Sequence, residues 1–298
     1  MTPVIVVTGA SGFVGRRLVQ RLSSHGVSVR TPSRADLDVT RLYEGSPALS
    51  GVDTVCHLAA YIPRDQHDPT EAARCMEVNA LGTLALLRAS AEAGVRRFVY
   101  GSSGNVYRPS DTPVNEDAPI YPSSRAPYYL ASKVAGELFT DHFRRAGRMS
   151  IAIARLGSVY GPGMAAEGVI ARFARQLLEG EPVRVLGGGR FRSDLVYVDD
   201  VVEGLTRMIA GGVEGAVNLG SGEASSMLDV ATTLVKLLDA DPDLVRLEPA
   251  GENGSPSGYT PLDIARARRE FDYSPRPLQA GLAEYVATIT PCEKQSSF

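Results

Sequence analysis

The sequence predicts an α/β protein, with a doubly wound parallel sheet that carries helices on both faces and a smaller α/β lobe toward the C-terminus. The first observation is that short apolar runs alternate with longer helical patterns through the first half of the chain. The second is that these runs are apolar throughout, as in strands buried on both faces. The third is a change of pattern beyond Gly161, where short helical segments alternate with Gly-, Pro- and Ser-rich loops.

The elements of the first half follow from these runs in order. Each expected strand is a run of three to five residues that is rich in apolar side chains. Each expected helix shows apolar residues at helical spacing. The expected strands are Val4–Val7, Val27–Val29, Thr54–Leu58, Phe98–Gly101 and Ile151–Ala154, and the expected helices are Phe13–His25, Glu71–Ala93 and Tyr129–Ala146.

The second half predicts shorter elements. The run VIARFARQLLEG reads as an amphipathic helix that Gly180 closes, and PVRVL and DLVYV read as strands. The pair Asp199–Asp200 would begin the helix VVEGLTRMI, with Asp200 as its cap. Further short helices are expected at Leu228–Leu238, Leu262–Glu270 and Leu278–Ile289, and the tail Pro291–Phe298 is expected to be disordered.

Composition excludes several classes of function. The 298 residues are 44% hydrophobic and 22% charged with a net charge of −3, which is typical of a globular protein and does not favour a nucleic-acid partner. Three scattered cysteines, Cys56, Cys75 and Cys292, suit a reducing, cytoplasmic setting rather than a disulfide framework. We expect no signal peptide and no membrane span, because no segment approaches the ~18 apolar residues that a span needs.

A glycine-rich turn joins the first strand to the first helix. In VIVVTGASGFVG, the residues Gly9, Gly12 and Gly15 stand three apart between the two elements. Glycines there allow a tight turn and a close approach of the backbone to a pyrophosphate, and the helix N-terminus offers free amides. The strand before and the helix after favour a dinucleotide site over a turn that only packs the helix on the strand.

The end of the second strand bears on which dinucleotide binds. A carboxylate there would accept bonds from the adenine ribose of NAD. The sequence VSVRTPSR instead offers Thr31, Ser33 and Arg34, which suit a 2′-phosphate. We therefore expect NAD(P), with NADP weakly favoured over NAD, although Arg34 is equally compatible with a solvated loop side chain.

Eight motifs follow one another along the chain in this order: TGASGFVG, DLDVT, HLAA, VNALGT, SSGNVY, YLASK, YGPG and YVDD. They resemble those of the extended short-chain dehydrogenase/reductases, and within them the NAD-dependent epimerase/dehydratase family that modifies nucleotide sugars. The resemblance implies a dinucleotide-binding Rossmann domain over residues 1–165 with a return segment at 194–221. It implies a substrate-binding lobe over 166–193 and 222–298.

The same resemblance implies the contacts of the cofactor. Asp38 and Val39 would lie at the adenine, Ala59 and Ala60 would line the crevice after the third strand, and Asn79 would lie close by. Asn79 is also compatible with a helix residue that satisfies a neighbouring loop. The cofactor residues expected in total are Gly9, Ser11, Gly12, Phe13, Val14, Gly15, Ser33, Arg34, Asp38, Val39, Leu58, Ala59, Ala60, Asn79, Tyr129 and Lys133.

Tyr129 and Lys133 in YYLASK form the expected catalytic pair. They are four residues apart and share one face of a helix, whereas Tyr128 points elsewhere. A tyrosine that removes a proton from a sugar hydroxyl near neutral pH needs its pKa lowered from ~10 by roughly 3 units. A nearby cation supplies ~1–3 units. Lys133 alone is therefore marginal, and the positive ring of the oxidised nicotinamide would contribute the rest.

Ser103 completes the expected catalytic set, with a hydroxyl that holds the reacting oxygen beside Tyr129. Ser102 competes for this role, and a serine at a strand end also commonly caps a loop. The family's sugar dehydratases carry an Asp–Glu pair directly after this position, where this chain has Gly104 and Asn105. Neither residue can act as the acid or base, so dehydration is disfavoured.

The substrate contacts depart from the family pattern. Ser158 stands where the family often has an asparagine, and the arginine usual before Asp194 is displaced to Arg192. We expect substrate contacts from Asn105, Ser158 and Arg192. No metal site is expected, because the residues His57, His67, Asp199 and Asp200 lack ligand spacing.

The sequence therefore predicts a sugar epimerase that works through a keto intermediate on a nucleoside-diphosphate sugar. An NADPH-dependent 4-ketoreductase is the first alternative. A catalytically silent NADP-binding regulatory protein is an alternative from another class. The expected partners are a small-molecule substrate and a second copy of the chain in a homodimer, with neither nucleic acid nor membrane.

Overall fold

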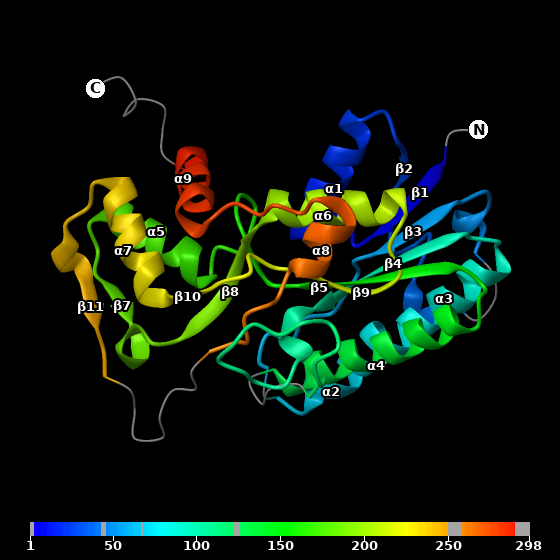
Figure 1. Ribbon diagram of the computed structural model, residues 1–298, viewed down its shortest axis with the longest axis horizontal. Helices are drawn as coiled ribbons and strands as arrows, with labels where there is room; N and C mark the ends of the chain where they lie inside the picture. Colours follow the sequence, from blue (N-terminus) through cyan, green and yellow to red (C-terminus); the bar gives the residue numbers. More distant parts are fainter. Residues whose placement is uncertain (1–2, 43–45, 67, 122–125, 250–257, 290–298) are drawn as a thin grey trace.

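The centre of the molecule is a six-stranded parallel sheet, seen in the computed structural model of residues 3–42, 46–66, 68–121, 126–249 and 258–289 (Figure 1). Its strand order is β2-β1-β3-β4-β5-β9, so the order reverses direction at β1. The strands are β1 (Val4–Thr8), β2 (Ser28–Arg30), β3 (Thr54–His57), β4 (Arg97–Ser103), β5 (Ser150–Leu156) and β9 (Gly215–Leu219). The predicted α/β fold with a parallel sheet is confirmed, and β9 is a sixth strand that the sequence analysis did not propose.

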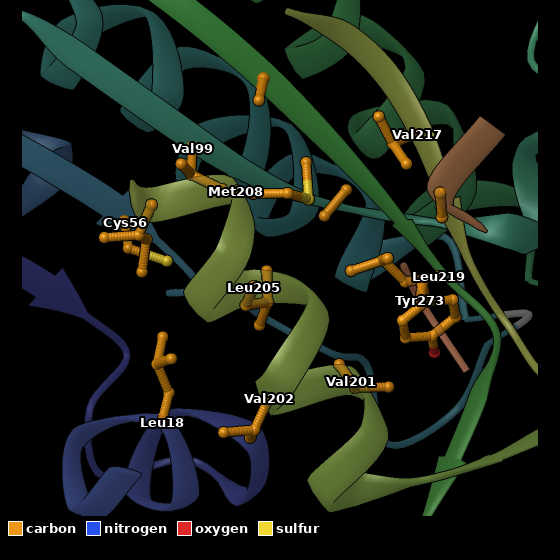
Figure 2. Packing of buried hydrophobic residues seen from close by; sticks show 14 of the residues in the cluster. Leu18, Cys56, Val99, Val201, Val202, Leu205, Met208, Val217, Leu219 and Tyr273 are labelled. Atoms are coloured by element: carbon orange, nitrogen blue, oxygen red, sulfur yellow. The ribbon is translucent and has the colours of Figure 1, made fainter. Parts of the chain in front are cut away.

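Helices cover both faces of this sheet, because successive strand residues point to opposite sides. On one face, α1 (Phe13–Ser24) and α6 (Val198–Ala210) bury their apolar sides against β3, β4 and β9. Figure 2 shows Leu18 of α1 and Leu205 of α6 among the side chains of this layer. On the other face, α3 (Gly82–Glu92) and α4 (Pro127–Arg145) lie side by side over a second apolar cluster (Figure 1).

The predicted helix Glu71–Ala93 is helical throughout, but its hydrogen-bonding type changes along its length. It begins as α2 (Thr70–Cys75), widens into the π-helical turn η3 (Met76–Leu81), and continues as α3. A π turn changes the direction of the residues it contains and is frequent at functional sites. Here it contains Asn79, which is buried.

Within the described ranges, the C-terminal half adds two small sheets and the helices α5, α7, α8 and α9, which gather on the left of Figure 1 except for α8. The helices α5, α7 and α9 surround the strand pair β7–β11 around an apolar cluster of their own. The remaining bounds are β6 (Ser158–Tyr160), α5 (Val169–Glu179), β7 (Val183–Val185), β8 (Arg192–Tyr197), β10 (Ala224–Ser226), α7 (Met227–Leu238), β11 (Val245–Leu247), α8 (Ala265–Phe271) and α9 (Leu278–Ile289). Gly180 closes α5 with a φ of +73°, as predicted.

The prediction that Asp200 caps α6 is wrong. The helix begins at Val198 with Tyr197 as its N-cap, so Asp200 lies inside the first turn. Its carboxylate accepts hydrogen bonds from the backbone amide and the guanidinium of Arg276, at 3.0 Å each. The side chain therefore joins α6 to the segment before α9.

The short 3-10 turns complete the described fold. They are η1 (Val39–Arg41), η2 (Pro47–Leu49), η4 (Gly104–Val106), η5 (Leu186–Gly189) and η6 (Pro242–Leu244). Across the described ranges, no helix combines the length and the apolar character that crossing a membrane requires. His67 and the tail Pro291–Phe298 lie outside the described residues.

Candidate active site

The glycine turn after β1 is packed too closely to admit side chains. Gly9 has a φ of +70°, and a Cβ there would lie 2.6 Å from the amide nitrogen of Ala59. A Cβ on Gly15 would lie 2.1 Å from the carbonyl oxygen of Gly9. The N-cap of α1 is Gly12, which supplies no side-chain cap, so the first amides of the helix are left for a ligand. This cradle fits the pyrophosphate of a dinucleotide.

A cavity of about 790 Å³ opens beside this turn, at the carboxyl ends of β1, β2 and β3. Eight of the predicted cofactor residues line it: Gly9, Ser11, Ser33, Arg34, Asp38, Val39, Ala59 and Ala60. The sequence analysis missed several others, among them Thr8, Arg16, Gln20, Tyr61, Arg74 and Val78. Arg16 follows Gly12 by one helical turn, and this spacing could have predicted from the sequence that Arg16 lines the cavity.

Carboxylates already occupy the polar groups at the end of β2. Ser33 donates its hydroxyl to Asp36 at 2.7 Å, and Arg34 pairs with Asp38 at 3.2 Å. These bonds differ from the expectation that Ser33 and Arg34 stand free for a 2′-phosphate. The loop is short, so its own acidic residues satisfy its donors. Arg16 has no ion pair within the described ranges and lines the same cavity.

The other eight predicted cofactor residues do not line this cavity: Gly12, Phe13, Val14, Gly15, Leu58, Asn79, Tyr129 and Lys133. Among them, Leu58 and Asn79 contact other parts of the fold. The side chain of Leu58 packs inward, where its Cδ2 would lie 2.8 Å from a Cβ on Gly101. Asn79 fastens the loop after β3, because its side chain accepts from the Tyr61 amide at 2.7 Å and donates to the Tyr61 carbonyl at 2.9 Å. It also donates to Ser132 of α4 at 2.9 Å. Asn79 thus joins the edge of the cavity to the helix of the tyrosine pair.

The tyrosine and lysine predicted from YYLASK share one face of α4. The Nζ of Lys133 lies 5.8 Å from the ring centroid of Tyr129 and 5.0 Å from that of Tyr100. It donates a hydrogen bond to the Gly101 carbonyl on β4 at 2.7 Å. The side chain of Lys133 is therefore fixed between α4 and the sheet, beneath Tyr129.

The electrostatics of this pair differ from the sequence expectation. Burial raises the pKa of Tyr129 to about 12, and the nearby Cys75 thiol adds to the rise. Burial also lowers the pKa of Lys133 to about 8, while the Glu137 carboxylate opposes that change. At neutral pH Lys133 is mainly charged and Tyr129 keeps its proton. The raised pKa of Tyr129, caused mainly by its burial, suits a residue that donates a proton rather than one that accepts it.

The two candidate serines at the end of β4 have different surroundings. Both serines are buried, but Ser102 donates to the Glu137 carboxylate, whereas Ser103 accepts only from the Asn105 amide, at 3.2 Å. Ser103 also caps the turn η4. Its hydroxyl hydrogen stays available for a ligand, which favours Ser103 over Ser102 as the residue that holds a reacting oxygen.

A buried ion pair anchors the catalytic helix to the sheet. Glu137 lies one turn after Lys133 and pairs with Arg155 of β5 at 2.8 Å, with each side chain 5% exposed. Arg155 also donates to the hydroxyl of Tyr107, which donates in turn to Asn218 of β9 at 2.7 Å. Residues 102, 155 and 218 are register partners across β4, β5 and β9.

The sequence of the chain identifies its family. Residues 5–220 match the model of the NAD-dependent epimerase/dehydratase family. The chain belongs to this family. It is 34% identical to the UDP-glucose 4-epimerase of Mycolicibacterium smegmatis, with 95% of this chain and 96% of that protein covered. It is 28% identical to a dTDP-4-dehydro-6-deoxy-D-allose reductase of Streptomyces, with 94% of each covered.

Solved structures of the NAD-dependent epimerase/dehydratase family have the same fold. MoeE5 in complex with UDP-glucose and NAD superposes with a TM-score of 0.80 at 30% identity, covering 95% of this chain and 97% of that one. Dehydratases such as dTDP-glucose 4,6-dehydratase are also among the relatives. The comparisons support an NAD-type cofactor and a nucleotide-sugar enzyme.

The residues expected to face the substrate of this family member are only partly gathered. Ser158 of β6 shares a hydrogen bond of 2.6 Å with Ser193 of β8, which uses the hydrogen of one of the two hydroxyls. Arg192 is exposed and donates to the carbonyl of Ala224 on β10. Asn105 lies next to Ser103 on η4. Asn105 is therefore beside the catalytic group, whereas Arg192 is occupied elsewhere in the lobe.

The described residues contain no group of three or more His, Cys, Asp or Glu side chains that could hold a metal ion. His57 is buried between two threonine hydroxyls, and Asp199 pairs with Arg17 at 2.8 Å.

Proposed function

We propose that this chain interconverts a secondary hydroxyl and a ketone on the sugar of a nucleoside-diphosphate sugar, with epimerisation as the outcome. The observation that carries the proposal is the placement of Tyr129 over Lys133, with the free Ser103 hydroxyl at the end of β4, beside a glycine-lined dinucleotide cavity. A nicotinamide cofactor, when bound, supplies the acceptor and donor of hydride.

Each side chain of the catalytic group then has a defined task. Ser103 donates a hydrogen bond to the reacting oxygen of the sugar, and Tyr129 carries that oxygen's proton between substrate and protein. The Lys133 ammonium stabilises the phenolate that exists whenever Tyr129 has given up its proton. Epimerisation requires that the ketone present its opposite face before hydride returns, so the site must let the sugar rotate.

Dehydration is disfavoured because neither of the two residues that follow Ser103, Gly104 and Asn105, can act as the additional acid or base. Gly104 is buried against Leu262 and Leu156, where a Cβ would lie 2.7 Å from the Leu262 side chain. The neighbouring Asn105 is an amide that neither gives up nor gains a proton near neutral pH. Gly104 therefore has no room for an acidic side chain without a shift of Leu262.

A ketoreductase is the second candidate, and one observation favours it. The high pKa of Tyr129 suits a residue that donates a proton to a ketone oxygen. Turnover of a panel of nucleotide sugars and their 4-keto forms, followed at the absorbance of the reduced nicotinamide, separates the candidates. An isomer formed without net change of cofactor supports the epimerase. Net consumption supports the reductase, and tight cofactor binding without turnover supports the regulatory protein.

We also propose a modest preference for NADP over NAD. The cations Arg34 and Arg16 line the cavity, and β2 itself ends at Arg30 without a carboxylate, the nearest acidic residues being Asp36 and Asp38 in the loop that follows. A 2′-phosphate would replace Asp38 as the partner of the exposed Arg34 guanidinium. Such a charge-assisted hydrogen bond contributes roughly 1.5–3 kcal/mol to the free energy of binding. The neighbour that holds NAD makes NAD preference the competing result.

Replacement Arg34→Ala is expected to weaken NADP binding by about ten- to a hundredfold and to leave NAD binding unchanged. Titration of the protein with both cofactors measures this. Arg41→Ala is the matched control, since Arg41 is highly exposed and lies 4.0 Å from the same Asp38 carboxylate without lining the main cavity. A clear preference for NAD that Arg34→Ala does not alter would contradict the proposal.

The homodimer is proposed from exposed apolar residues on the helices beside the active site. Leu81 of η3 is 57% exposed and Leu138 of α4 is 66% exposed, on helices that pack against each other. A second copy of the chain would bury them at about 25 cal/mol per Å² of apolar surface. In sedimentation velocity, Leu138→Glu should yield monomers, whereas Leu178→Glu on α5 should not. A wild-type monomer at micromolar concentration would contradict the homodimer.

A further inference from the structure

His57 has no role in the reaction proposed for Ser103, Tyr129 and Lys133. It is the last residue of β3, directly before the segment 58–61 that borders the cofactor cavity, and it is 1% exposed. Both ring nitrogens contact threonine hydroxyls: Nδ1 lies 2.7 Å from Thr8 Oγ1, and Nε2 lies 3.1 Å from Thr83 Oγ1. A buried imidazole with two such partners is fixed in position, and the direction of the two hydrogen bonds sets its tautomer.

The direction of each hydrogen bond follows from Thr83. Its hydroxyl donates to the Asn79 carbonyl at 2.6 Å, and a carbonyl can only accept. The single hydroxyl hydrogen of Thr83 is thereby used, so its oxygen must accept from His57, whose Nε2 carries the proton.

The other nitrogen, Nδ1, then accepts from the Thr8 hydroxyl, and the oxygen of that hydroxyl accepts from the Ala59 amide at 3.3 Å. Burial, reinforced by the Lys133 charge, lowers the pKa of His57 to about 3, so the ring is neutral. The rings of Phe98 and Tyr100 pack against it at 6.1 Å and 5.9 Å between centroids.

Both ends of this chain of hydrogen bonds are connected to the segment 58–61. At one end, Thr8 holds the Ala59 amide, and the backbone at Ala59 packs directly on Gly9 of the phosphate turn. At the other end, Thr83 holds the carbonyl of Asn79, whose side chain binds both backbone groups of Tyr61. Ala59, Ala60 and Tyr61 all line the cavity.

We propose that His57 is a positioning residue for the dinucleotide: as the neutral Nε2–H tautomer it couples Thr8 to Thr83 and so fixes segment 58–61 against the phosphate turn. The inference rests on the proposed function only in taking a dinucleotide as the ligand. Without the ring, Thr8 and Thr83 would each lose a buried partner, and the two anchors of the segment would no longer share a fixed connection.

Replacement Thr83→Val tests the proposal because it removes the acceptor of the His57 proton while keeping the side-chain shape. We expect the Kd for NAD and NADP, measured by calorimetry, to rise roughly tenfold, the net contribution of about one hydrogen bond. Thr83→Ser keeps the hydroxyl and should restore wild-type affinity. Thr206→Val is the control, because Thr206 makes the same kind of bond to the Val202 carbonyl on α6, at 2.7 Å.

A second measurement uses the unaltered protein. Nitrogen chemical shifts of the His57 ring should report the Nε2–H tautomer and stay constant between about pH 5 and pH 8. An Nδ1–H tautomer, or a ring that titrates in this range, would overturn the inference, and so would a Thr83→Val variant that binds cofactor like the wild type. If the wild type itself binds neither NAD nor NADP, the proposed function fails instead.

Discussion

Replacing Tyr129 by Phe should reduce turnover by about 10²–10⁴-fold, the contribution typical of one positioned acid–base group. Affinity for the cofactor should change little, since the ring and its packing remain. The contact between the ring and Lys133 is kept in the variant, so the free energy of unfolding should also stay close to that of the wild type. Steady-state kinetics with both cofactors, together with urea unfolding, measure all three quantities.

Tyr128→Phe is the matched control for this prediction. The two tyrosines are adjacent on α4 and both are half-buried, yet only Tyr129 shares a face with Lys133. The Tyr128 variant should keep most of its activity. If the two variants exchanged these effects, the assignment of the catalytic hydroxyl from helical spacing would be wrong.

Replacing Lys133 by Met should reduce turnover roughly ten- to a thousandfold, since a nearby cation shifts a pKa by about 1–3 units. The pH dependence gives a sharper result. The pKa of Lys133 is about 8, so the ammonium that stabilises the Tyr129 phenolate is present below that pH and is lost above it. Wild-type turnover limited by proton donation should therefore fall as the pH rises through about 8, and the Lys133→Met profile should lack this fall.

The lowered pKa of Lys133 should also make the free energy of unfolding depend on pH, in a direction that can be stated in advance. The folded-state pKa of Lys133 lies below its ordinary value of 10.5, so between about pH 8 and 10.5 the unfolded chain binds more protons. The contribution of Lys133 to the free energy of unfolding should rise with pH in that window and be absent from Lys133→Met. Lys236→Met, at an exposed position on α7, is the control. Identical pH profiles for the wild type and Lys133→Met would contradict the proposed role.

The high pKa of Tyr129 bears on the choice between epimerase and reductase. An epimerase uses the tyrosine in both directions, first as a base and then as an acid, so the pKa must fall when cofactor and substrate fill the site. A reductase uses the tyrosine only as an acid, which the present pKa already suits. The shape of the pH profile in each direction is therefore as informative as the product.

The sequence by itself determined the features that depend on neighbours along the chain. A continuous apolar run such as residues 151–154 predicts a buried strand whatever lies beside it, and β5 contains it. The spacing of Gly9, Gly12 and Gly15 predicts a close turn, because the contacts that exclude a Cβ are mostly within the turn. The four-residue spacing of Tyr129 and Lys133 is a property of any helix.

Only the tertiary structure decided the features that depend on register between distant segments. Residues 102, 155 and 218 became partners because parallel strands placed them in one row, and no local pattern marks that row. The hydrogen bond between Ser158 and Ser193 and the place of His57 between Thr8 and Thr83 have the same origin. A polar side chain in a folded protein takes the nearest partner that burial leaves to it, and that partner is set by packing in space rather than by order in sequence.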